Sequence, residues 1–417
     1  MKVVHLSRLD NRGGSAKSAL KIHYGLRNLN VDSKMYVSEK EKKSDPTIKK
    51  IIRSKFLWMI DKKFGEVMKR LGYPDLLYFF SHFFYKKKDI CTADIIQVYN
   101  IHGGFFEVRQ LKRLARNSIV VWRLSDMWAF TGHCAYSYNC EKWKNGCKKC
   151  EDLQSYPEVG RDHCNFLWKH KKKVYDEIQN LHIVTPSKWL FNCVEESPLL
   201  QGKKIKYIPN GVDCSVFRPT EKQEAKKCLG LDDTKLTLLF LAANINEERK
   251  GLRYLLDALN KLGTIRQKIN IVCVGKCDGI NDKDMIQLGV VNDEKKMALI
   301  YSAADIYVLP TLADNLPNTI IECMACKTAV IAFNIGGVPD VVRHMDTGYL
   351  VEKEDINGLA KGIRFLLDSE EIRNQISENA MRLIQGEFTI ELQAKRFWDY
   401  YNELLKEIGR DNEKTIC

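Results

Sequence analysis

Short apolar runs alternate with helical stretches along both halves of this 417-residue chain, and this alternation restricts the fold more than any other feature. The first unit is an apolar run at 3–6, a glycine turn, and a helical pattern over 15–29. Such alternation predicts parallel sheets with helices packed on them. We therefore expect an α/β protein with two Rossmann-like domains that face a cleft.

The pattern places most elements and one boundary. Strands are predicted at 3–6, 31–37, 95–98, 119–122, 183–185, 205–208, 236–242, 270–274, 306–309 and 328–333. Helices are predicted at 15–29, 252–262, 295–303, 318–325 and 390–408, with a short one at 338–342. The alternation restarts near the turn 209–213. We predict domains at 1–212 and 213–390, followed by a terminal helical segment at 391–417.

Composition excludes some classes of protein. No apolar run approaches the roughly 18–20 residues that span a bilayer, and the first residues do not form a signal peptide. We therefore expect a cytoplasmic protein. The formal charge of +13 indicates an anionic partner. Nucleic acid is not expected, because the chain has no helix-turn-helix, RNA-binding or basic-zipper signature.

The segment 51–88 mixes aromatic and aliphatic residues with many lysines and arginines. This composition suits an amphipathic helix lying on the anionic inner face of a cell membrane. A helix docked in a cleft with its basic side in water has the same composition. The sequence leaves both alternatives open.

The strongest functional pattern lies between residues 304 and 351. A buried strand ends at Pro310, a polar loop contains Asp314 and Asn315, and a helix follows Pro317. Ligands bind at the carboxyl ends of strands in open α/β sheets, and a helix N-terminus there attracts phosphate. Glu322 lies two turns into that helix. Without further pattern, Asp314 would be a helix cap and Glu322 a solvated side chain.

The order and spacing of these motifs, with Leu288–Val291 before them and the turn 336–340 after them, resemble the retaining glycosyltransferases of family 4, which have the GT-B fold. The resemblance covers the C-terminal half of the chain. It implies that 213–390 binds a UDP- or GDP-sugar and that 1–212 contacts the acceptor. It also implies that the last helix packs back on the N-terminal domain.

The resemblance assigns catalytic roles to Lys250 and Asp314. The residues that it implies for donor binding are Gly13, Gly14, Asn244, Arg249, Lys250, Val290, Asn315, Leu316, Pro317, Asn318, Thr319 and Glu322. At two positions, Asp314 and Asp340, this chain has aspartate where the family has glutamate, so the carboxylate is preserved. A third departure is Asn244, which stands where the family places a basic residue, so either Arg249 or another basic group substitutes for it or the leaving phosphate has one cation fewer.

In the N-terminal half, many family members have a histidine where this chain has Ser125. Asp126 and His133 are then the candidate catalytic residues, and His102 is a further one near the predicted cleft. Each could also be an ordinary structural polar residue. Likewise, the Gly13-Gly14 pair lets a backbone approach a phosphate, but it also occurs in ordinary turns.

Four cysteines, Cys134, Cys140, Cys147 and Cys150, fall within seventeen residues. Four thiolates suit a tetrahedral structural Zn²⁺, and the last two form a Cys-x-x-Cys knuckle. Free thiols and a redox pair are the alternatives. A similar stretch occurs in a subset of polysaccharide-assembling family 4 enzymes.

The sequence thus predicts a retaining glycosyltransferase of polysaccharide biosynthesis, acting on a glycan or lipid-linked glycan and peripheral to the membrane. We expect no cofactor to be required for catalysis. The alternatives are a non-catalytic sugar-nucleotide-binding protein and another GT-B activity, such as a sucrose or sugar-phosphate synthase.

Overall fold

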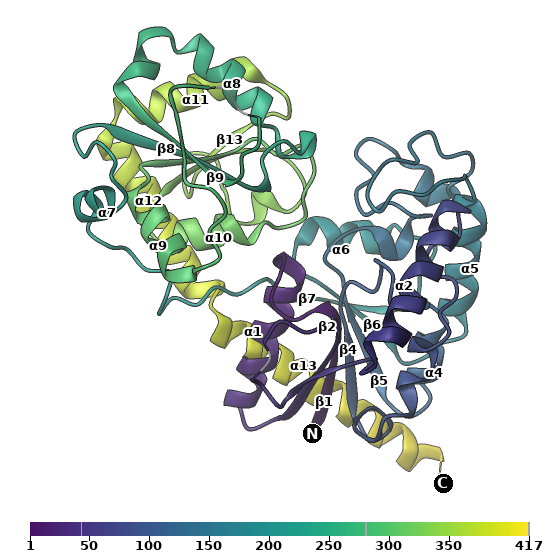
Figure 1. Ribbon diagram of the computed structural model, residues 1–417. Helices are drawn as coiled ribbons and strands as arrows, with labels where there is room; N and C mark the ends of the chain where they lie inside the picture. Colours follow the sequence, from purple (N-terminus) through teal and green to yellow (C-terminus); the bar gives the residue numbers. More distant parts are fainter. Residues whose placement is uncertain (43, 280–281, 416–417) are drawn as a thin grey trace. The chain divides into compact units, whose positions relative to one another are not determined.

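The computed structural model describes residues 1–42, 44–279 and 282–415, which form two compact units. One unit contains Met1–Pro209 together with Ile390–Cys417, and the other contains Asn210–Thr389. Each unit is built on one sheet, as Figure 1 shows. The chain is therefore an α/β protein with two Rossmann-like units, as the alternation predicted.

The first sheet has seven strands in the order β3-β2-β1-β4-β5-β6-β7. Every pairing between them is parallel. The strands are β1 (Lys2–Leu9), β2 (Asp32–Glu39), β3 (Ile48–Lys50), β4 (Ile95–Val98), β5 (Ile119–Arg123), β6 (Leu181–Thr185) and β7 (Lys204–Tyr207). Its helices are α1 (Gly14–Asn28), α2 (Lys55–Arg70), α3 (Lys88–Cys91), α4 (Gln110–Leu114), α5 (Cys164–Asp176), α6 (Lys188–Glu195) and α13 (Ile390–Thr415). Short 3₁₀ turns are η1 (Ser81–Lys86), η2 (Trp128–Phe130) and η3 (Lys142–Asn145).

The second sheet has six strands in the order β10-β9-β8-β11-β12-β13, again all parallel. They are β8 (Leu236–Asn244), β9 (Ile269–Lys276), β10 (Met285–Gln287), β11 (Ile306–Leu309), β12 (Ala329–Phe333) and β13 (Tyr349–Val351). Its helices are α7 (Lys222–Cys228), α8 (Leu252–Lys261), α9 (Glu294–Ala303), α10 (Asn318–Ala325), α11 (Ile356–Asp368) and α12 (Glu370–Glu387). Its 3₁₀ turns are η4 (Glu248–Lys250), η5 (Gly263–Lys268) and η6 (Val338–Asp340).

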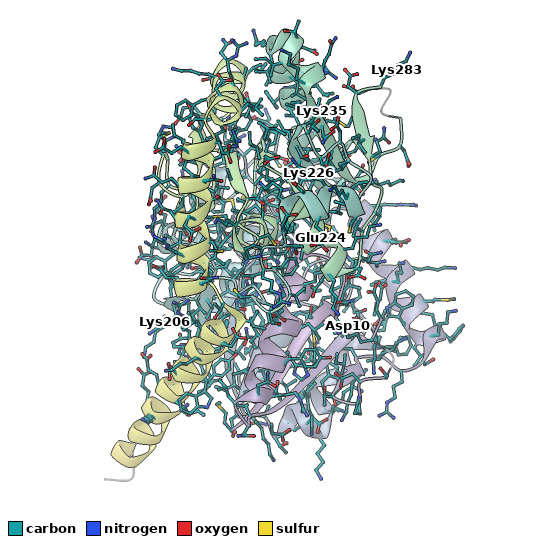
Figure 2. All side chains as sticks on the ribbon, turned by 90° about the vertical axis from the view of Figure 1, so that its left-hand side faces the viewer. Asp10, Lys206, Glu224, Lys226, Lys235 and Lys283 are labelled. Carbon is teal, nitrogen blue, oxygen red and sulfur yellow. The ribbon has the colours of Figure 1, made fainter. Side chains whose placement is uncertain are left out.

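The last helix, α13, packs against α1 in the first unit (Figure 1). Gly25 permits this close approach, because a Cβ added there would lie 2.5 Å from the Cβ of Ala394. Phe397 and Tyr401 are fully buried with side chains of α1 and the sheet. At the margin, Lys206 of β7, which is labelled in Figure 2, pairs with Glu403 at 3.2 Å. The chain thus returns to the first unit after completing the second.

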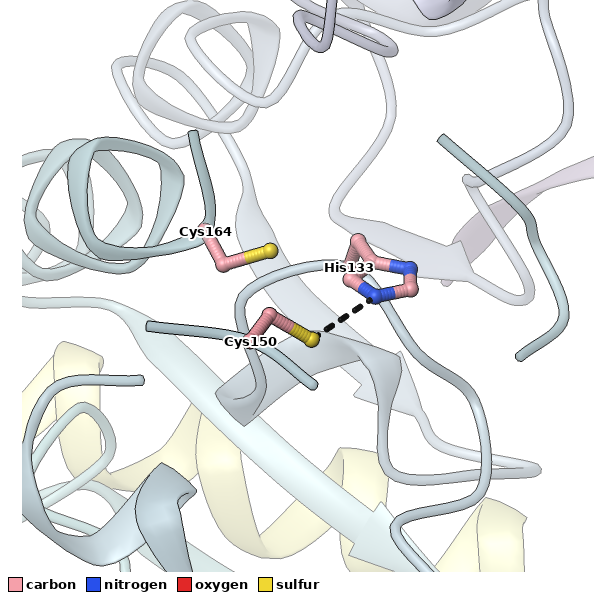
Figure 3. A group of neighbouring side chains, drawn as sticks. All are labelled: His133, Cys150 and Cys164. Carbon is pink, nitrogen blue, oxygen red and sulfur yellow. Dashed lines mark hydrogen bonds between the residues drawn. The ribbon is translucent and has the colours of Figure 1, made fainter. Parts of the chain in front are cut away.

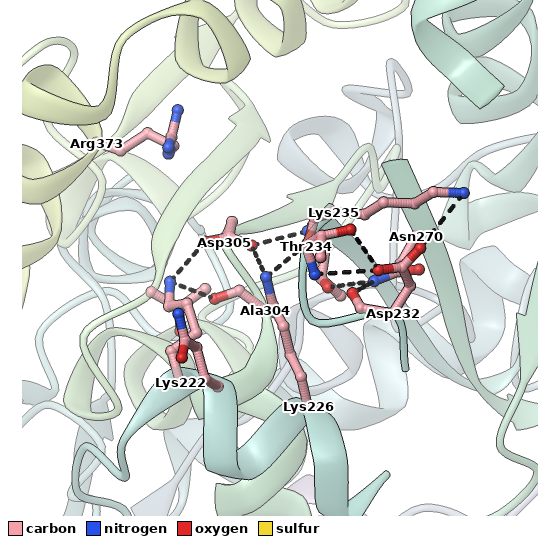
Figure 4. A network of polar contacts seen from close by, with 12 residues as sticks. Lys222, Lys226, Asp232, Thr234, Lys235, Asn270, Ala304, Asp305 and Arg373 are labelled. Carbon is pink, nitrogen blue, oxygen red and sulfur yellow. Dashed lines mark hydrogen bonds and ion pairs between the residues drawn. The ribbon is translucent and has the colours of Figure 1, made fainter. Parts of the chain in front are cut away.

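A buried ion-pair network fixes α7 to the start of β11 in the second unit (Figure 4). The Asp305 carboxylate accepts hydrogen bonds from Lys222 at 2.8 Å and Lys226 at 2.9 Å. It also accepts the backbone N–H of Thr237 at 2.8 Å. Burial raises the pKa of Asp305, but Lys222 and Lys226 outweigh that effect, so its pKa lies below the usual value. Asp305 therefore holds the strand start and has its oxygens occupied by protein.

Several stretches differ from the sequence predictions. The helix α7 and the short strands β10 and β13 fall in segments for which no element was predicted. The helices α11 and α12 lie in a region for which no element was predicted. The short helix expected at 338–342 is a single 3₁₀ turn, η6.

Candidate active site

The candidate site of the second unit lies where two loops meet at the centre of its sheet. The loop after β8 and the loop after β11 follow neighbouring parallel strands. The chain moves from β8 to β9 on one side and returns to β11 on the other. This is a topological switch point, where open α/β sheets bind ligands.

Gly251 brings these loops together. Its φ of +76° is left-handed, and an added Cβ would lie 1.8 Å from the carbonyl oxygen of Pro310. The Arg249 carbonyl then accepts the N–H of Leu312 at 2.8 Å and the hydroxyl of Thr311 at 2.9 Å. The Arg-Lys-Gly turn is therefore fastened directly to the end of β11.

This contact gathers one carboxylate and two cations. Asp314 lies 2.9 Å from the Lys250 ammonium and 3.3 Å from the Arg249 guanidinium. All three side chains are less than one-fifth exposed. Burial raises the pKa of Asp314, but the nearby charges of Lys250 and Arg249 outweigh that effect. The pKa of the carboxyl group therefore lies below its usual value.

The glycine pair after β12 supports the same loop. Gly336 has φ +50°, and an added Cβ there would lie 2.0 Å from the Asp314 carbonyl oxygen. The N–H of Gly337 donates to the Asn315 carbonyl at 2.6 Å. The first contact gives a physical reason for glycine at position 336 of the predicted turn.

The Asn244 side chain is uncharged, and its contact is within its own turn. Its side-chain oxygen accepts the N–H of Asn246 at 3.1 Å and so closes its own turn. Arg249 is therefore the second cation beside Asp314.

Most of the remaining residues predicted to bind the nucleotide-sugar donor lie at the start of α10. Pro317 occupies the N-cap position, one residue before the helix rather than in its first turn. Thr319 accepts a hydrogen bond from Tyr307 at 3.0 Å, and Asn318 accepts one from Asn210 at 2.8 Å. Leu316 is buried, whereas Val290 in the loop after β10 is 62% exposed.

Glu322 is buried on the second turn of α10. Tyr301 of α9 donates to its carboxylate at 3.3 Å. Glu322 thus belongs to the same helix start as Asn318 and Thr319, but the structure places it inward rather than on a solvated helix face. Neither carboxylate of the predicted pair, Asp314 or Glu322, is an ordinary surface side chain.

The N-terminal candidates belong to the other unit. Gly13 is the N-cap of α1 at φ +87°, and Gly14 is its first helical residue. Asp126 accepts hydrogen bonds from His102 at 2.9 Å, Asn100 at 3.0 Å and the N–H of Trp128 at 3.0 Å. His102 is therefore the histidine that Asp126 orients.

His133, which the sequence grouped with Asp126, lies in a different environment. It lines a pocket with Cys134, Cys140, Cys147, Cys150 and Cys164, which we call the cysteine pocket. Its two ring nitrogens face the Pro157 carbonyl at 3.0 Å and the Cys150 sulfur at 3.5 Å. The structure thus places His133 with the cysteines rather than with the candidate catalytic Asp126.

The sequence grouped four of these five cysteines and missed Cys164. Cys164 is the first residue of α5 and is buried, and no recognisable spacing connects it to the knuckle. A hydrogen bond from Cys164 and a contact with His133 lower the pKa of the Cys150 thiol below its usual value.

Comparisons with known proteins concern part of the second unit and the fold of the chain. Residues 235–369 match the family model described as glycosyl transferases group 1. Sucrose-phosphate synthase from Thermosynechococcus elongatus has 18% identity and a TM-score of 0.71, covering 97% of this chain and 99% of that chain. HepE of Anabaena, solved in complex with UDP, has 14% identity and a TM-score of 0.65, covering 97% and 100%.

The fold is therefore that of the GT-B glycosyltransferases. The match of residues 235–369 to the group 1 glycosyltransferase model is consistent with the resemblance inferred from the motifs around Asp314. Among sequence relatives, the colanic acid biosynthesis glycosyl transferase WcaC of Escherichia coli (strain K12) is 24% identical over 245 residues. That match covers 57% of this chain and 57% of WcaC, so the chain spans little more than half of that relative.

Proposed function

We propose that this protein is a retaining glycosyltransferase that takes a sugar from a UDP- or GDP-sugar. The observation that carries the proposal is the Asp314–Lys250–Arg249 cluster at the switch point of a group 1 glycosyltransferase domain. Two cations there match the two negative charges of a nucleotide diphosphate. HepE, which has a similar fold, was solved in complex with UDP, and this supports the same class of ligand for this chain.

The cluster has a clear chemical use during sugar transfer. As the bond from sugar to phosphate breaks, negative charge grows on the leaving diphosphate. Lys250 and Arg249, already held by Asp314, stabilise that charge without first having to reorganise. The departing phosphate oxygen can accept the acceptor proton on the same face of the sugar, which retains the configuration without a side-chain nucleophile.

Glu322 has a separate role in the proposal. A carboxylate just inside the start of α10 can accept two hydrogen bonds from the ribose hydroxyls of the donor. The N–H groups at the start of α10 lie in the same loop region, and a helix N-terminus favours phosphate. Donor binding thus depends on Glu322, whereas charge stabilisation depends on Lys250 and Arg249.

The acceptor is proposed to be a glycan or lipid-linked glycan in polysaccharide biosynthesis, the process in the name of WcaC. Among the described residues, no helix is long and apolar enough to cross a bilayer. Access to a lipid-linked acceptor would then come through the surface of α2. Large apolar side chains are exposed in and after this helix: Phe56, Met59, Val67, Leu71, Phe79 and Phe83.

A thermal-shift panel of UDP-, GDP- and ADP-sugars tests the proposal. One donor should raise the unfolding midpoint of the wild type, because binding at 100 times Kd stabilises by about 2.7 kcal/mol. Glu322→Ala should abolish the shift, and Glu371→Ala, at an exposed glutamate of α12, should preserve it. A wild type that no nucleotide sugar stabilises would contradict the proposed donor class.

A further inference from the structure

The cysteine pocket of the first unit contains a set of groups that sugar transfer does not use. It is a cavity of about 30 Å³ lined by five cysteines and His133. A volume of this size accommodates an object no larger than one or two water molecules. The pocket is therefore too small for a sugar or a nucleotide and has the size appropriate for an ion.

Three potential ligand atoms already converge in the pocket. The Nε2 atom of His133 and the sulfur atoms of Cys150 and Cys164 all lie within 4.8 Å of one another. Figure 3 shows the three side chains directed toward a common point from three separate stretches of chain. Ligands around a tetrahedral ion are separated by about 3.3–3.8 Å, given metal–ligand bonds of 2.0–2.3 Å.

His133 is oriented as a metal ligand. A carbonyl oxygen can only accept, so the 3.0 Å contact with Pro157 requires Nδ1 to carry the hydrogen. In neutral imidazole the lone pair is then on Nε2, the atom that faces Cys150. Histidines that bind metals typically donate their other N–H to a carbonyl or carboxylate in this manner.

Backbone contacts hold the sulfur atoms in place. The Asp162 carboxylate accepts the N–H of Cys150 at 2.8 Å and that of Cys164 at 3.1 Å. One side chain therefore fixes the spacing of both cysteines. The N–H of Gly132 points at the sulfur of Cys147 at 3.1 Å, a contact that favours a thiolate.

A buried cation lies beside this group. Lys171 of α5 is 3% exposed, and its ammonium donates to the carbonyls of Trp128 at 2.6 Å and Thr131 at 3.1 Å. It is close enough to the Cys134 and Cys147 thiols to interact with them electrostatically. Negative charge on these sulfur atoms would favour the ammonium form of this buried lysine.

We propose that the cysteine pocket binds one Zn²⁺ through His133 Nε2 and the sulfur atoms of Cys147, Cys150 and Cys164. Each of the three thiols releases its proton to solvent on binding. Zn²⁺ with three thiolates and a neutral imidazole carries a charge of −1, which Lys171 balances. Four protein ligands close the coordination shell, so the ion is structural and ties the loop after β5 to α5.

Metal analysis of the purified full-length chain tests this assignment. We expect one zinc per chain, reduced at least tenfold in Cys164→Ser and His133→Ala. Cys140→Ser and Cys228→Ser, at exposed thiols, should retain it. Loss in Cys140→Ser with retention in Cys164→Ser would overturn the ligand set in favour of four neighbouring cysteines.

X-ray absorption of the zinc-loaded wild type tests the ligands without relying on a variant that folds. The expected shell is three sulfurs at about 2.3 Å and one nitrogen at about 2.0–2.1 Å. Four sulfurs would remove His133 from the shell and overturn the assignment. A wild type without metal whose intact mass shows a Cys150–Cys164 disulfide would overturn the site itself. Neither result would alter the nucleotide-sugar test, because that site lies in the other unit.

Discussion

The Lys250 ammonium lies 2.9 Å from the Asp314 carboxylate, although the two residues are 64 positions apart in the chain. Gly251 makes the contact feasible, because any side chain there would collide with Pro310. Arg249 approaches the same carboxylate from the preceding position. A short turn thus delivers two cations to one place at the end of β11, where a negative ligand would find them already oriented.

Removal of either partner of this pair should lower transfer activity. In Lys250→Ala the leaving diphosphate loses a preorganised cation, so we expect kcat to fall by about 10²–10³-fold. Asp314→Asn should also reduce kcat, because the uncharged amide no longer holds both cations. Initial rates with a saturating donor provide the measurement.

Lys295→Ala is the matched control, since Lys295 is an exposed lysine on α9 of the same unit. Its rate should equal that of the wild type. If Lys250→Ala retained more than a third of the activity, the charge-stabilising role of the cluster would be refuted.

The sequence was most informative where a strand is buried on both faces. The bounds of β4, β11 and α10 were predicted to the residue, because short apolar runs between polar loops leave little freedom in placement. The helix α12 was missed: two of its buried positions are polar, Arg373 and Ser377, and they interrupt the apolar pattern.

The sequence placed Asp314 and Asn315 on one loop, but it could not predict contacts between distant segments. Lys250 and Asp314 could each be assigned from motif resemblance, but their direct ion pair depends on how closely the turn at Gly251 approaches Pro310. Cys164 was missed for the same reason. It reaches Cys150 only because Asp162 binds both backbone N–H groups, a relationship that spacing does not reveal.

The Asp305 network should be essential for folding of the second unit. Asp305→Asn leaves the Lys226 ammonium, which is 5% exposed, without its carboxylate. Breaking a buried ion pair by removing one partner costs about 3–5 kcal/mol. We expect a corresponding fall in the free energy of unfolding, measured by urea denaturation.

Asp233→Asn serves as the control, because Asp233 forms only a 3.5 Å surface pair with Lys227. Its effect should remain below about 1 kcal/mol. Equal stability of the two variants would show that the Asp305 pairs contribute no more than surface pairs.

Acid should destabilise the first unit through two buried histidines. His5 and His23 share the Ser33 hydroxyl, at 3.0 and 2.7 Å. Burial lowers the pKa of His23 from 6.5 to about 4, and burial with the nearby His23 lowers that of His5 as well. The unfolded chain therefore takes up protons near pH 6.5, whereas the folded chain resists them until near pH 4.

The contribution of these neutral histidines to the free energy of unfolding is therefore fully present above pH 6.5. It is lost as the pH drops toward 4, by up to about 3 kcal/mol for His23 alone. Unfolding midpoints at pH 7.5, 6.0 and 4.5 should show this decline. His23→Gln should flatten it, whereas His344→Gln, at an exposed histidine of the other unit, should not. An unchanged slope in His23→Gln would exclude His23 as its source.

The exposed face of α2 should bind anionic lipid. Phe56, Met59 and Val67 are 66%, 40% and 52% exposed, and they follow one another at helical spacing. The neighbouring Lys62 and Lys63 are exposed as well. Apolar insertion together with attraction to anionic headgroups is the usual basis of interfacial helix binding.

We expect the wild type to float with vesicles containing phosphatidylglycerol and to be released at high salt, which screens the charges. The variant Phe56→Ser/Met59→Ser/Val67→Ser should lose most of this binding, while Trp398→Ser, at an exposed tryptophan of α13, should retain it. Equal flotation of the triple variant and the wild type would refute the membrane role of α2, and the docked-helix alternative would then account for its basic composition.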